Sequence, residues 1–311
     1  MGLLDGKVAI VTGGGRGVGR GEAVQLAAAG AKVVVNDLGG SQTGDGADKT
    51  PAEEVVAVIK ARGGEAVANY DDVADFAGSK NLVDQAIEAF GRLDIVVNNA
   101  GIMRDKMLTS MSEDDYDAVV RVHQKGTFCV SKHAASYWRE QSKAGSQPRA
   151  SIINTVSSAG LQGNIGQTNY GAAKAAIAAM TIIHSLELAQ YGVRVNAIAP
   201  GGLTRLVGTL PGQEAPSKHP EEYEGFERMN PGNSAPMVVW LASDAAQHVT
   251  GQVFRAVGND ISHYEPWKLG SGIQSVDRKT KEMTQWDPNL IGPAINAAVF
   301  HSRHPGLQMG G

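Results

Sequence analysis

The chain has 311 residues, of which 42% are hydrophobic and 19% are charged, a balance typical of an ordinary globular protein. Its net charge of −4 at pH 7 argues against a nucleic-acid partner, because proteins that bind nucleic acid carry a basic face. The single cysteine, Cys129, cannot form an intramolecular disulfide, and we see no apolar segment long enough for a signal peptide or a membrane span, so we expect a cytoplasmic protein without a membrane partner.

Short apolar runs alternate with longer helical patterns along the chain. Seven of these runs are rich in Val, Ile and Ala and lack strict alternation, as expected for strands that are covered on both faces. They are residues 7–12, 32–36, 65–69, 93–98, 151–156, 193–199 and 252–257. This order is typical of βαβ units. We predict a single doubly wound α/β domain with a seven-stranded parallel sheet and helices on both faces.

The helical segments have readable ends. Thr50 and Glu53 form the pattern of a capping box with Pro51 between them, and Gly63 ends the same helix. Longer helical patterns cover residues 113–143 and 170–190.

Three segments are irregular. Residues 38–49 form a polar, glycine-rich insertion after the second strand, and residues 202–235 are rich in Gly, Pro and Glu, as a substrate flap would be. Residues 263–311 follow the last strand and carry Trp267 and Trp286. We therefore predict a catalytic domain over residues 1–262 and an extension, residues 263–311, that docks on this domain or on a partner subunit.

The first strand runs into the sequence TGGGRGVG, residues 12–19, which opens a helix. Glycines let the backbone approach a pyrophosphate, and a helix N-terminus offers N–H groups and the positive end of a dipole. A plain turn explains many glycine-rich segments, but the strand–turn–helix context favours dinucleotide binding. Asp37, at the end of the second strand, is placed to accept hydrogen bonds from the adenine ribose, although a solvated turn aspartate would look the same.

Further motifs follow in a fixed order. They are Asn98-Asn99-Ala100-Gly101 after the fourth strand, Ser157, Tyr170-Gly171-Ala172-Ala173-Lys174, and NAIAPG at residues 196–201. Together with the glycine turn they resemble the short-chain dehydrogenase/reductase family over roughly residues 5–262. The resemblance implies a Rossmann-type fold and an oxidoreductase acting on CH–OH groups.

The resemblance also implies a nicotinamide dinucleotide cofactor. The residues implied to bind it are Gly13, Arg16, Gly17, Val18, Gly19, Asp37, Asp72, Val73, Asn99, Ala100, Gly101, Tyr170, Lys174, Pro200, Gly201 and Thr204. Two of these residues, Arg16 and Asp37, favour different cofactors. Arg16 stands where NADPH-using relatives often carry a basic residue, whereas Asp37 would repel a 2′-phosphate. Because an arginine can swing into solvent and an aspartate at a strand end cannot, we predict NAD rather than NADP.

Tyr170 and Lys174 lie one helical turn apart on the same face. A lysine ammonium near a phenol stabilises the phenolate, so we expect a Tyr170 pKa below its ordinary value of about 10. Such a tyrosine can exchange a proton with the substrate oxygen as hydride moves, and Ser157 can hold the same oxygen.

In many family members an asparagine in the fourth helix supports a proton path behind the lysine. Here the matching stretch, RVHQKG at residues 121–126, places His123 at that position. A lone helical histidine is more often structural, but its ordinary pKa near 6.5 also suits a relay. Both interpretations stay open for His123, which we count with Ser157, Tyr170 and Lys174 as a catalytic candidate.

Two stretches narrow the resemblance. VVVNDLGG at residues 33–40 and the RVHQKG stretch look like the 3-hydroxyacyl-CoA dehydrogenase domain of peroxisomal multifunctional enzyme type 2 and related bacterial hydroxysteroid dehydrogenases. This implies NAD-dependent oxidation of a secondary alcohol, a 3-hydroxyacyl-CoA or a hydroxysteroid, by a homodimer or homotetramer.

Two alternatives remain from the sequence. One is an NADPH-dependent 3-oxoacyl reductase, and the other is an inactive dinucleotide-binding regulatory protein, which would be marked by loss of Ser157, Tyr170 or Lys174. A metal site is not expected, because His301 and His304 have no further ligands clustered with them.

Overall fold

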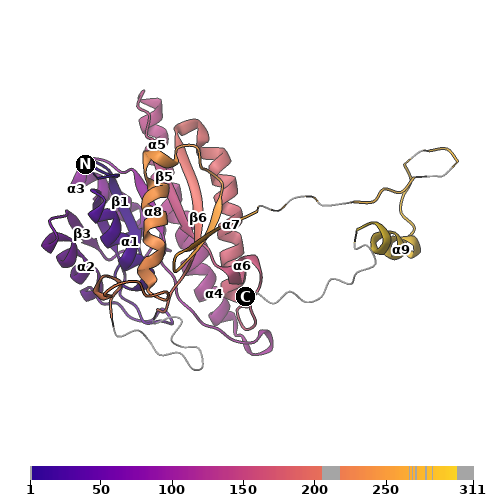
Figure 1. The fold of residues 1–311 in the computed structure, drawn as a ribbon, viewed down its shortest axis with the longest axis horizontal. Helices are drawn as coiled ribbons and strands as arrows, with labels where there is room; N and C mark the ends of the chain where they lie inside the picture. Colours follow the sequence, from indigo (N-terminus) through magenta and orange to yellow (C-terminus); the bar gives the residue numbers. More distant parts are fainter. Residues whose placement is uncertain are drawn as a thin grey trace. The chain divides into compact units, whose positions relative to one another are not determined.

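One sheet of eight strands organises the described residues. In chain order the strands are β1 (Val8–Thr12), β2 (Lys32–Asn36), β3 (Ala66–Asn69), β4 (Ile95–Asn98), β5 (Ala150–Thr155), β6 (Val193–Gly201), β7 (Val253–Val257) and β8 (Asp260–Tyr264). Their order across the sheet is β3-β2-β1-β4-β5-β6-β7-β8 (Figure 1). The strands from β3 to β7 pair in parallel, which confirms the predicted doubly wound α/β class.

The prediction of seven strands is wrong by one, because β8 pairs antiparallel with β7. Gly258 has a φ of 58° and, with Asn259, forms a two-residue turn that pairs Val257 with Asp260. Two-residue hairpins need positive φ in the turn, and Gly-Asn is one of the dipeptides that supply it. The signal for this strand was therefore present in the sequence.

Helices cover both faces of the sheet. One face packs against α1 (Gly17–Ala28), α2 (Thr50–Ala61) and α8 (Ala235–Ala242), and the other against α3 (Phe76–Phe90), α5 (Gly126–Lys143) and α7 (Thr168–Leu188). The alternation of β1 shows why. Ala9 and Val11 point to the first set of helices, whereas Val8 and Ile10 point to the second.

The structure differs from the sequence prediction at the N-terminus of α2 and within the helical pattern of residues 113–143. The N-cap of α2 is Lys49, and Thr50 donates its backbone N–H to Asp48 Oδ1 at 3.0 Å, so the predicted capping box of Thr50 and Glu53 is wrong. The helical pattern over residues 113–143 consists of α4 (Glu113–Val120), a π-helical turn (Arg121–Lys125) and α5. Such π-turns are often found at functional sites.

Helix α7, continued to Tyr191, is the one helix among the described residues that is long and apolar enough to cross a membrane, with a mean hydropathy of 1.3. Ala173, Lys174 and Ile177 on this helix are buried, and Ile177 packs with residues of β6 and β7. We therefore interpret α7 as a core helix of the α/β unit.

The chain winds outward in both directions from the neighbouring strands β1 and β4. In open parallel sheets, ligands bind in the crevice at the carboxyl ends of strands where the winding reverses. The loops that follow β1 and β4 meet there. A Cβ added to Gly13 would lie 2.8 Å from the Cα of Ala100, so only glycine allows this approach.

The structure describes residues 2–204, 218–265, 267, 269, 272–276, 279–281 and 283–299. The chain divides into a first unit that ends at Tyr264 and a second that spans Glu265–Met309. The second unit contains α9 (Pro288–Ala298), whose N-cap Asp287 accepts a hydrogen bond from Asn289 N. Docking of the extension stays a prediction, and His301 and His304 lie outside the described residues.

Candidate active site

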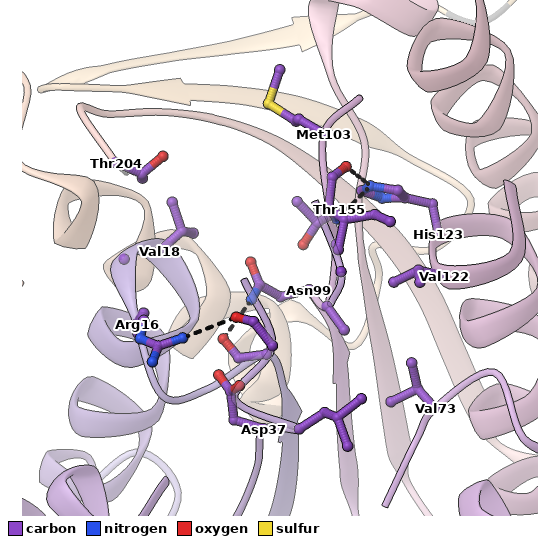
Figure 2. A pocket seen from close by; sticks show the side chains of 18 of the residues that line it. Arg16, Val18, Asp37, Val73, Asn99, Met103, Val122, His123, Thr155 and Thr204 are labelled. Atoms are coloured by element: carbon purple, nitrogen blue, oxygen red, sulfur yellow. Dashed lines mark hydrogen bonds between the residues drawn. The ribbon is translucent and has the colours of Figure 1, made fainter. Parts of the chain in front are cut away.

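A cavity of about 420 Å³ lies at the carboxyl ends of β1 and β4 (Figure 2). Most of the predicted site residues line it, namely Gly13, Arg16, Gly17, Val18, Asp37, Asp72, Val73, Asn99, Ala100, Gly101, His123, Tyr170, Lys174, Pro200 and Thr204. Gly19, Gly201 and Ser157 do not belong to the lining. The structure therefore brings together residues from seven separate stretches of the sequence.

The glycine turn forms one wall. Gly13 and Gly17 have φ values of 61° and 53°, and Thr204 lies against Gly17. No side chain caps the N-terminus of α1, so its first N–H groups suit a ligand phosphate. A Cβ on Gly19 would lie 2.3 Å from the carbonyl oxygen of Gly13, so Gly19 serves close packing of helix on turn. Gly201 is similar, because a Cβ there would lie 2.5 Å from Val257.

Asp37 is fixed to the glycine turn. Its Oδ2 accepts a hydrogen bond from Gly15 N at 2.9 Å, and its Oδ1 accepts one from Gly39 N at 2.7 Å. These bonds hold the carboxylate at the end of β2 beside the cavity. An acidic group at this place fits the ribose hydroxyls of a dinucleotide.

Arg16 is held by the insertion after β2. Its Nη1 donates to the carbonyl oxygen of Gly40 at 3.3 Å, and its Nη2 lies 3.8 Å from Asp48 Oδ2. Figure 2 shows Arg16 and Asp37 on the same side of the pocket.

The insertion itself, residues 38–49, forms part of the cavity wall, a role that the sequence reading did not assign to it. Leu38, Gly40, Ser41 and Gly44 line the cavity. The insertion is tied to the loop after β4, because Met103 N donates to Gln42 O at 3.1 Å and Arg104 Nε donates to Thr43 O at 2.8 Å.

Asn99 connects the loops that follow β1 and β4. Its side-chain Nδ2 donates to the carbonyl oxygens of Thr12 (3.0 Å) and Gly13 (3.1 Å). In return, Thr12 Oγ1 accepts hydrogen bonds from the backbone N–H groups of Asn99 and Ala100. Asn99 therefore fixes the shape of the crevice.

The opposite wall combines the loop after β3 with the π-turn. Asp72 forms an ion pair with Arg121, and Val73 contacts the backbone at Gly126, where an added Cβ would lie 2.8 Å from it. Arg121 and Val122 line the cavity but were not predicted, because nothing in a linear pattern says which side chains of an irregular helix turn inward.

Described residues of the predicted flap also reach the cavity. They are Gly202, Thr204, Lys218, His219, Pro220 and Pro231. Glu221 anchors this segment on α1 through a buried ion pair with Arg20, at 2.7 Å. Residues 205–217 lie outside the described residues.

Tyr170, Lys174 and Ser157 come together at one end of the cavity. Lys174 is 2% exposed, and its Nζ donates to the carbonyl oxygen of Thr155 at 2.6 Å. The same Nζ lies 5.6 Å from the centre of the Tyr170 ring. Ser157 caps the short helix α6 (Ser158–Leu161), where its Oγ accepts a hydrogen bond from Ala159 N at 3.2 Å, and its hydroxyl acts to lower the pKa of Tyr170.

Burial controls the ionisation of this pair. Burial raises the pKa of Tyr170, the hydrogen bond from Ser157 opposes this, and the charge of Asp105 adds to it. Burial also lowers the pKa of Lys174 to about 7. The predicted lowering of the Tyr170 pKa is therefore wrong for the protein by itself, because loss of solvation outweighs the nearby lysine.

A buried carboxyl group on α1, Glu22, was missed by the sequence reading. The residue is 0% exposed, and neither of its carboxyl oxygens has a hydrogen-bond partner among the described residues. Burial raises its pKa to about 8, while the charge of Lys174 acts in the other direction. The available signal was a glutamate within an otherwise small and apolar helix, EAVQLAAAG.

His123 lies in the π-turn with its ring edge-on to Tyr170, 5.2 Å between ring centres. Its Nε2 lies within hydrogen-bonding distance of both the backbone N (3.1 Å) and O (2.8 Å) of Ile102, as Figure 2 shows. Burial, reinforced by the charge of Lys174, lowers its pKa to about 3. The ordinary histidine pKa near 6.5, which would suit a relay, does not hold at this buried position, and His123 stays neutral at physiological pH.

Comparison with known proteins agrees with this geometry. The family model for short chain dehydrogenase matches residues 7–209. The hydroxyacyl-CoA dehydrogenase ChsB1 of Mycobacterium tuberculosis is 40% identical over 97% of this chain and 91% of its own length. Peroxisomal multifunctional enzyme type 2 of Mus musculus is 40% identical over 80% of this chain, which corresponds to 31% of that longer protein.

A solved structure also matches. The crystal structure of a short chain dehydrogenase from Mycobacterium avium is 44% identical, covers all of both chains and superposes with a TM-score of 0.85. The protein described here belongs to the short-chain dehydrogenase family of oxidoreductases, which use a nicotinamide dinucleotide cofactor.

Proposed function

We propose that this protein is an NAD-dependent dehydrogenase that oxidises the secondary alcohol of a 3-hydroxyacyl thioester or a hydroxysteroid to a ketone. The observation that carries the proposal is that Tyr170 and Lys174 line a cavity formed by the glycine turn and the loop after β4, while Ser157, outside the lining, acts on Tyr170. The choice of an acyl thioester is supported by the similarity to ChsB1 of Mycobacterium tuberculosis, which is named as a hydroxyacyl-CoA dehydrogenase.

The chain's own residues divide the chemistry among themselves. A bound nicotinamide supplies the hydride acceptor. Tyr170 exchanges a proton with the substrate oxygen, and Ser157 orients that oxygen by a hydrogen bond. Lys174 holds its position through Thr155 and faces the tyrosine ring. Because the pKa of Tyr170 is raised, alcohol oxidation is expected to become faster as the pH rises.

The proposed preference for NAD is supported by the contacts that Arg16 and Asp37 make. Arg16 is engaged by Gly40 and faces Asp48, so it is not poised to receive a 2′-phosphate. Asp37 is fixed beside the glycine turn by two backbone N–H groups. A phosphate placed near this carboxylate would be repelled, whereas ribose hydroxyls would donate hydrogen bonds to it.

One observation favours the reductive alternative, a 3-oxoacyl reductase that uses NADPH. The raised pKa keeps Tyr170 a proton donor at neutral pH, which is the state that ketone reduction needs. Direction and cofactor are therefore tested together. We would follow nicotinamide absorbance with NAD⁺ and NADP⁺ on 3-hydroxyacyl-CoA and hydroxysteroid substrates, and with NADH and NADPH on the corresponding ketones.

Fastest turnover of a 3-hydroxyacyl-CoA or a hydroxysteroid with NAD⁺ would support the proposal. Activity confined to NADPH and 3-oxoacyl substrates would replace it with the reductase. No turnover with any pair, despite cofactor binding, would favour a regulatory protein with an inactive site.

We further propose a homodimer or homotetramer located in the cytoplasm. Ile182, Ile183 and Leu186 on α7 and Phe128 on α5 are large apolar side chains that are exposed in a single chain. Apolar residues concentrated on two long helices suit burial between subunits.

A further inference from the structure

Asp105 is a partly buried carboxyl group in the loop after β4. It follows Met103, which lines the cavity, and its Oδ2 accepts a hydrogen bond from Gln167 Nε2 at 2.7 Å. Gln167 is the N-cap of α7, three residues before Tyr170. This bond therefore holds the carboxyl group at the start of α7, the end of the helix that carries the tyrosine.

Two further hydrogen bonds hold the chain around Asp105 to the start of α7. Asn169 Nδ2 donates to the carbonyl oxygen of Arg104 at 3.0 Å, and Lys106 N donates to the carbonyl oxygen of Gly166 at 2.9 Å. The residues on both sides of Asp105 are therefore tied to the residues on both sides of Gln167. These bonds hold the Asp105 segment against the start of α7.

The second oxygen of Asp105 is not neutralised. Oδ1 is buried and has no hydrogen-bond partner among the described residues. The cations on either side are engaged elsewhere, because Lys106 pairs with Asp115 at 3.0 Å and Arg104 pairs with Asp114 and Asp45. A carboxylate without a cation in a poorly solvated place acts strongly on its neighbours.

The groups that face Tyr170 are few. Lys174 lies on its own helix, Ser157 comes from the loop after β5, and His123 faces it from the π-turn. Lys174 is itself deprived of solvent and His123 stays neutral. Among the described residues, Asp105 contributes a negative charge that raises the pKa of Tyr170.

We propose that Asp105 is a positioning residue that holds Tyr170 in its protonated form. The inference rests on the proposed function, in which Tyr170 exchanges the proton. A nearby negative charge disfavours the phenolate, so Asp105 keeps the tyrosine a proton donor and raises the pH above which it can accept a proton from an alcohol.

The test uses three variants of the full chain. Asp105→Asn removes the charge but keeps an oxygen that can accept from Gln167. Asp105→Glu keeps the charge and should restore wild-type behaviour. Asp117→Asn removes an exposed carboxylate from α4 and is the matched control. Thermal melting of each variant checks that it is folded.

Two readouts are compared. The first is the alkaline titration of Tyr170 by NMR of protein labelled with ¹³C at tyrosine Cζ, with the signal assigned by its loss in Tyr170→Phe. The second is kcat/KM for alcohol oxidation as a function of pH. Asp105→Asn should move the onset of the Tyr170 titration, and the alkaline limb of the rate, down by about one pH unit. The other two variants should leave both in place.

Each outcome decides something. A shifted NMR titration with a shifted rate limb supports both proposals. A shifted titration with an unchanged rate limb supports the role of Asp105 but contradicts Tyr170 as the group that limits the rate. An unchanged titration in folded Asp105→Asn overturns the inference, whatever the rates do.

Discussion

Arg16 donates a hydrogen bond to the carbonyl oxygen of Gly40 at 3.3 Å, which joins the glycine turn to the insertion after β2. The arginine is therefore turned toward the protein's own backbone, while Asp37 stands at the end of β2 with both oxygens fixed. We expect these two side chains to decide between the two nicotinamide cofactors, with the aspartate favouring NAD.

The first prediction concerns this choice. We expect the wild-type protein to favour NAD over NADP by at least about tenfold in kcat/KM, equivalent to about 1.4 kcal/mol. Asp37→Ala should remove most of this preference, because the repulsion of the 2′-phosphate disappears. Steady-state rates with both cofactors check it, with Asp45→Ala on the exposed part of the insertion as control. Equal use of both cofactors by the wild-type protein would show that Arg16 dominates.

The second prediction concerns the stability contributed by Glu22. Its folded-state pKa, about 8, lies above its ordinary value of 4.5. Its contribution to stability is therefore fully present below about pH 4.5 and is lost as the pH rises through 8. Between about pH 5 and 7 the wild-type protein should lose about 2 kcal/mol of unfolding free energy relative to Glu22→Gln.

The pH range of about 5 to 7 is chosen so that the titration of Lys174 does not contribute to the measured change in stability. The pKa of Lys174 is lowered to about 7 from 10.5, so its own effect on stability falls between those values and has the opposite sign. Urea unfolding at several pH values provides the measurement, and Glu88→Gln, an exposed glutamate on α3, is the control. Parallel curves for wild type and Glu22→Gln would contradict the raised pKa.

The third prediction concerns His123. Because its pKa is lowered to about 3, the imidazole ring stays in its neutral form and neither gains nor loses a proton near neutral pH. We expect His123→Gln to lower the melting temperature, since Ile102 loses its buried partner, while the shape of the pH–rate profile between about pH 5 and 8 stays the same. A rate limb near pH 6.5 that vanishes in the variant would restore the relay hypothesis.

The fourth prediction concerns assembly. Leu186 on α7 is 76% exposed in a single chain and lies beside Ile182 and Ile183. Leu186→Asp should convert the oligomer to monomers, because a charge would be buried in an apolar interface. Light scattering checks this, with Leu3→Asp as control, since Leu3 is 62% exposed but far from α7 in the sequence. A wild-type protein that is monomeric at micromolar concentration would refute the interface.

The sequence was sufficient for the framework of the fold and the position of the crevice. Val/Ile-rich runs identify the strands of a sheet covered on both faces, and Gly13 and Gly17 mark a turn that only positive φ can form. Asn99, Tyr170 and Lys174 are recognised because their motifs are local and ordered. Each of these signals resides in a short stretch of chain.

The remainder depends on contacts between distant stretches. Arg121 reaches the cavity through an irregular helix turn, and Asp105 is held at the start of α7 by Gln167, 62 residues away in the chain. The direction of the Tyr170 pKa also depends on burial, which no spacing of residues reports. Sequence reasoning weighed the lysine charge alone and missed the larger loss of solvation.

The most direct test of the central claim is the turnover of Tyr170→Phe beside its affinity for NAD. The substitution removes the phenolic hydroxyl but keeps the ring, so cofactor affinity should stay within about threefold of wild type while kcat falls by about 10²–10⁴. Fluorescence titration gives the affinity and nicotinamide absorbance gives the rate. A variant that turns over substrate within about threefold of the wild-type rate would show that Tyr170 is not the proton donor and acceptor of this site.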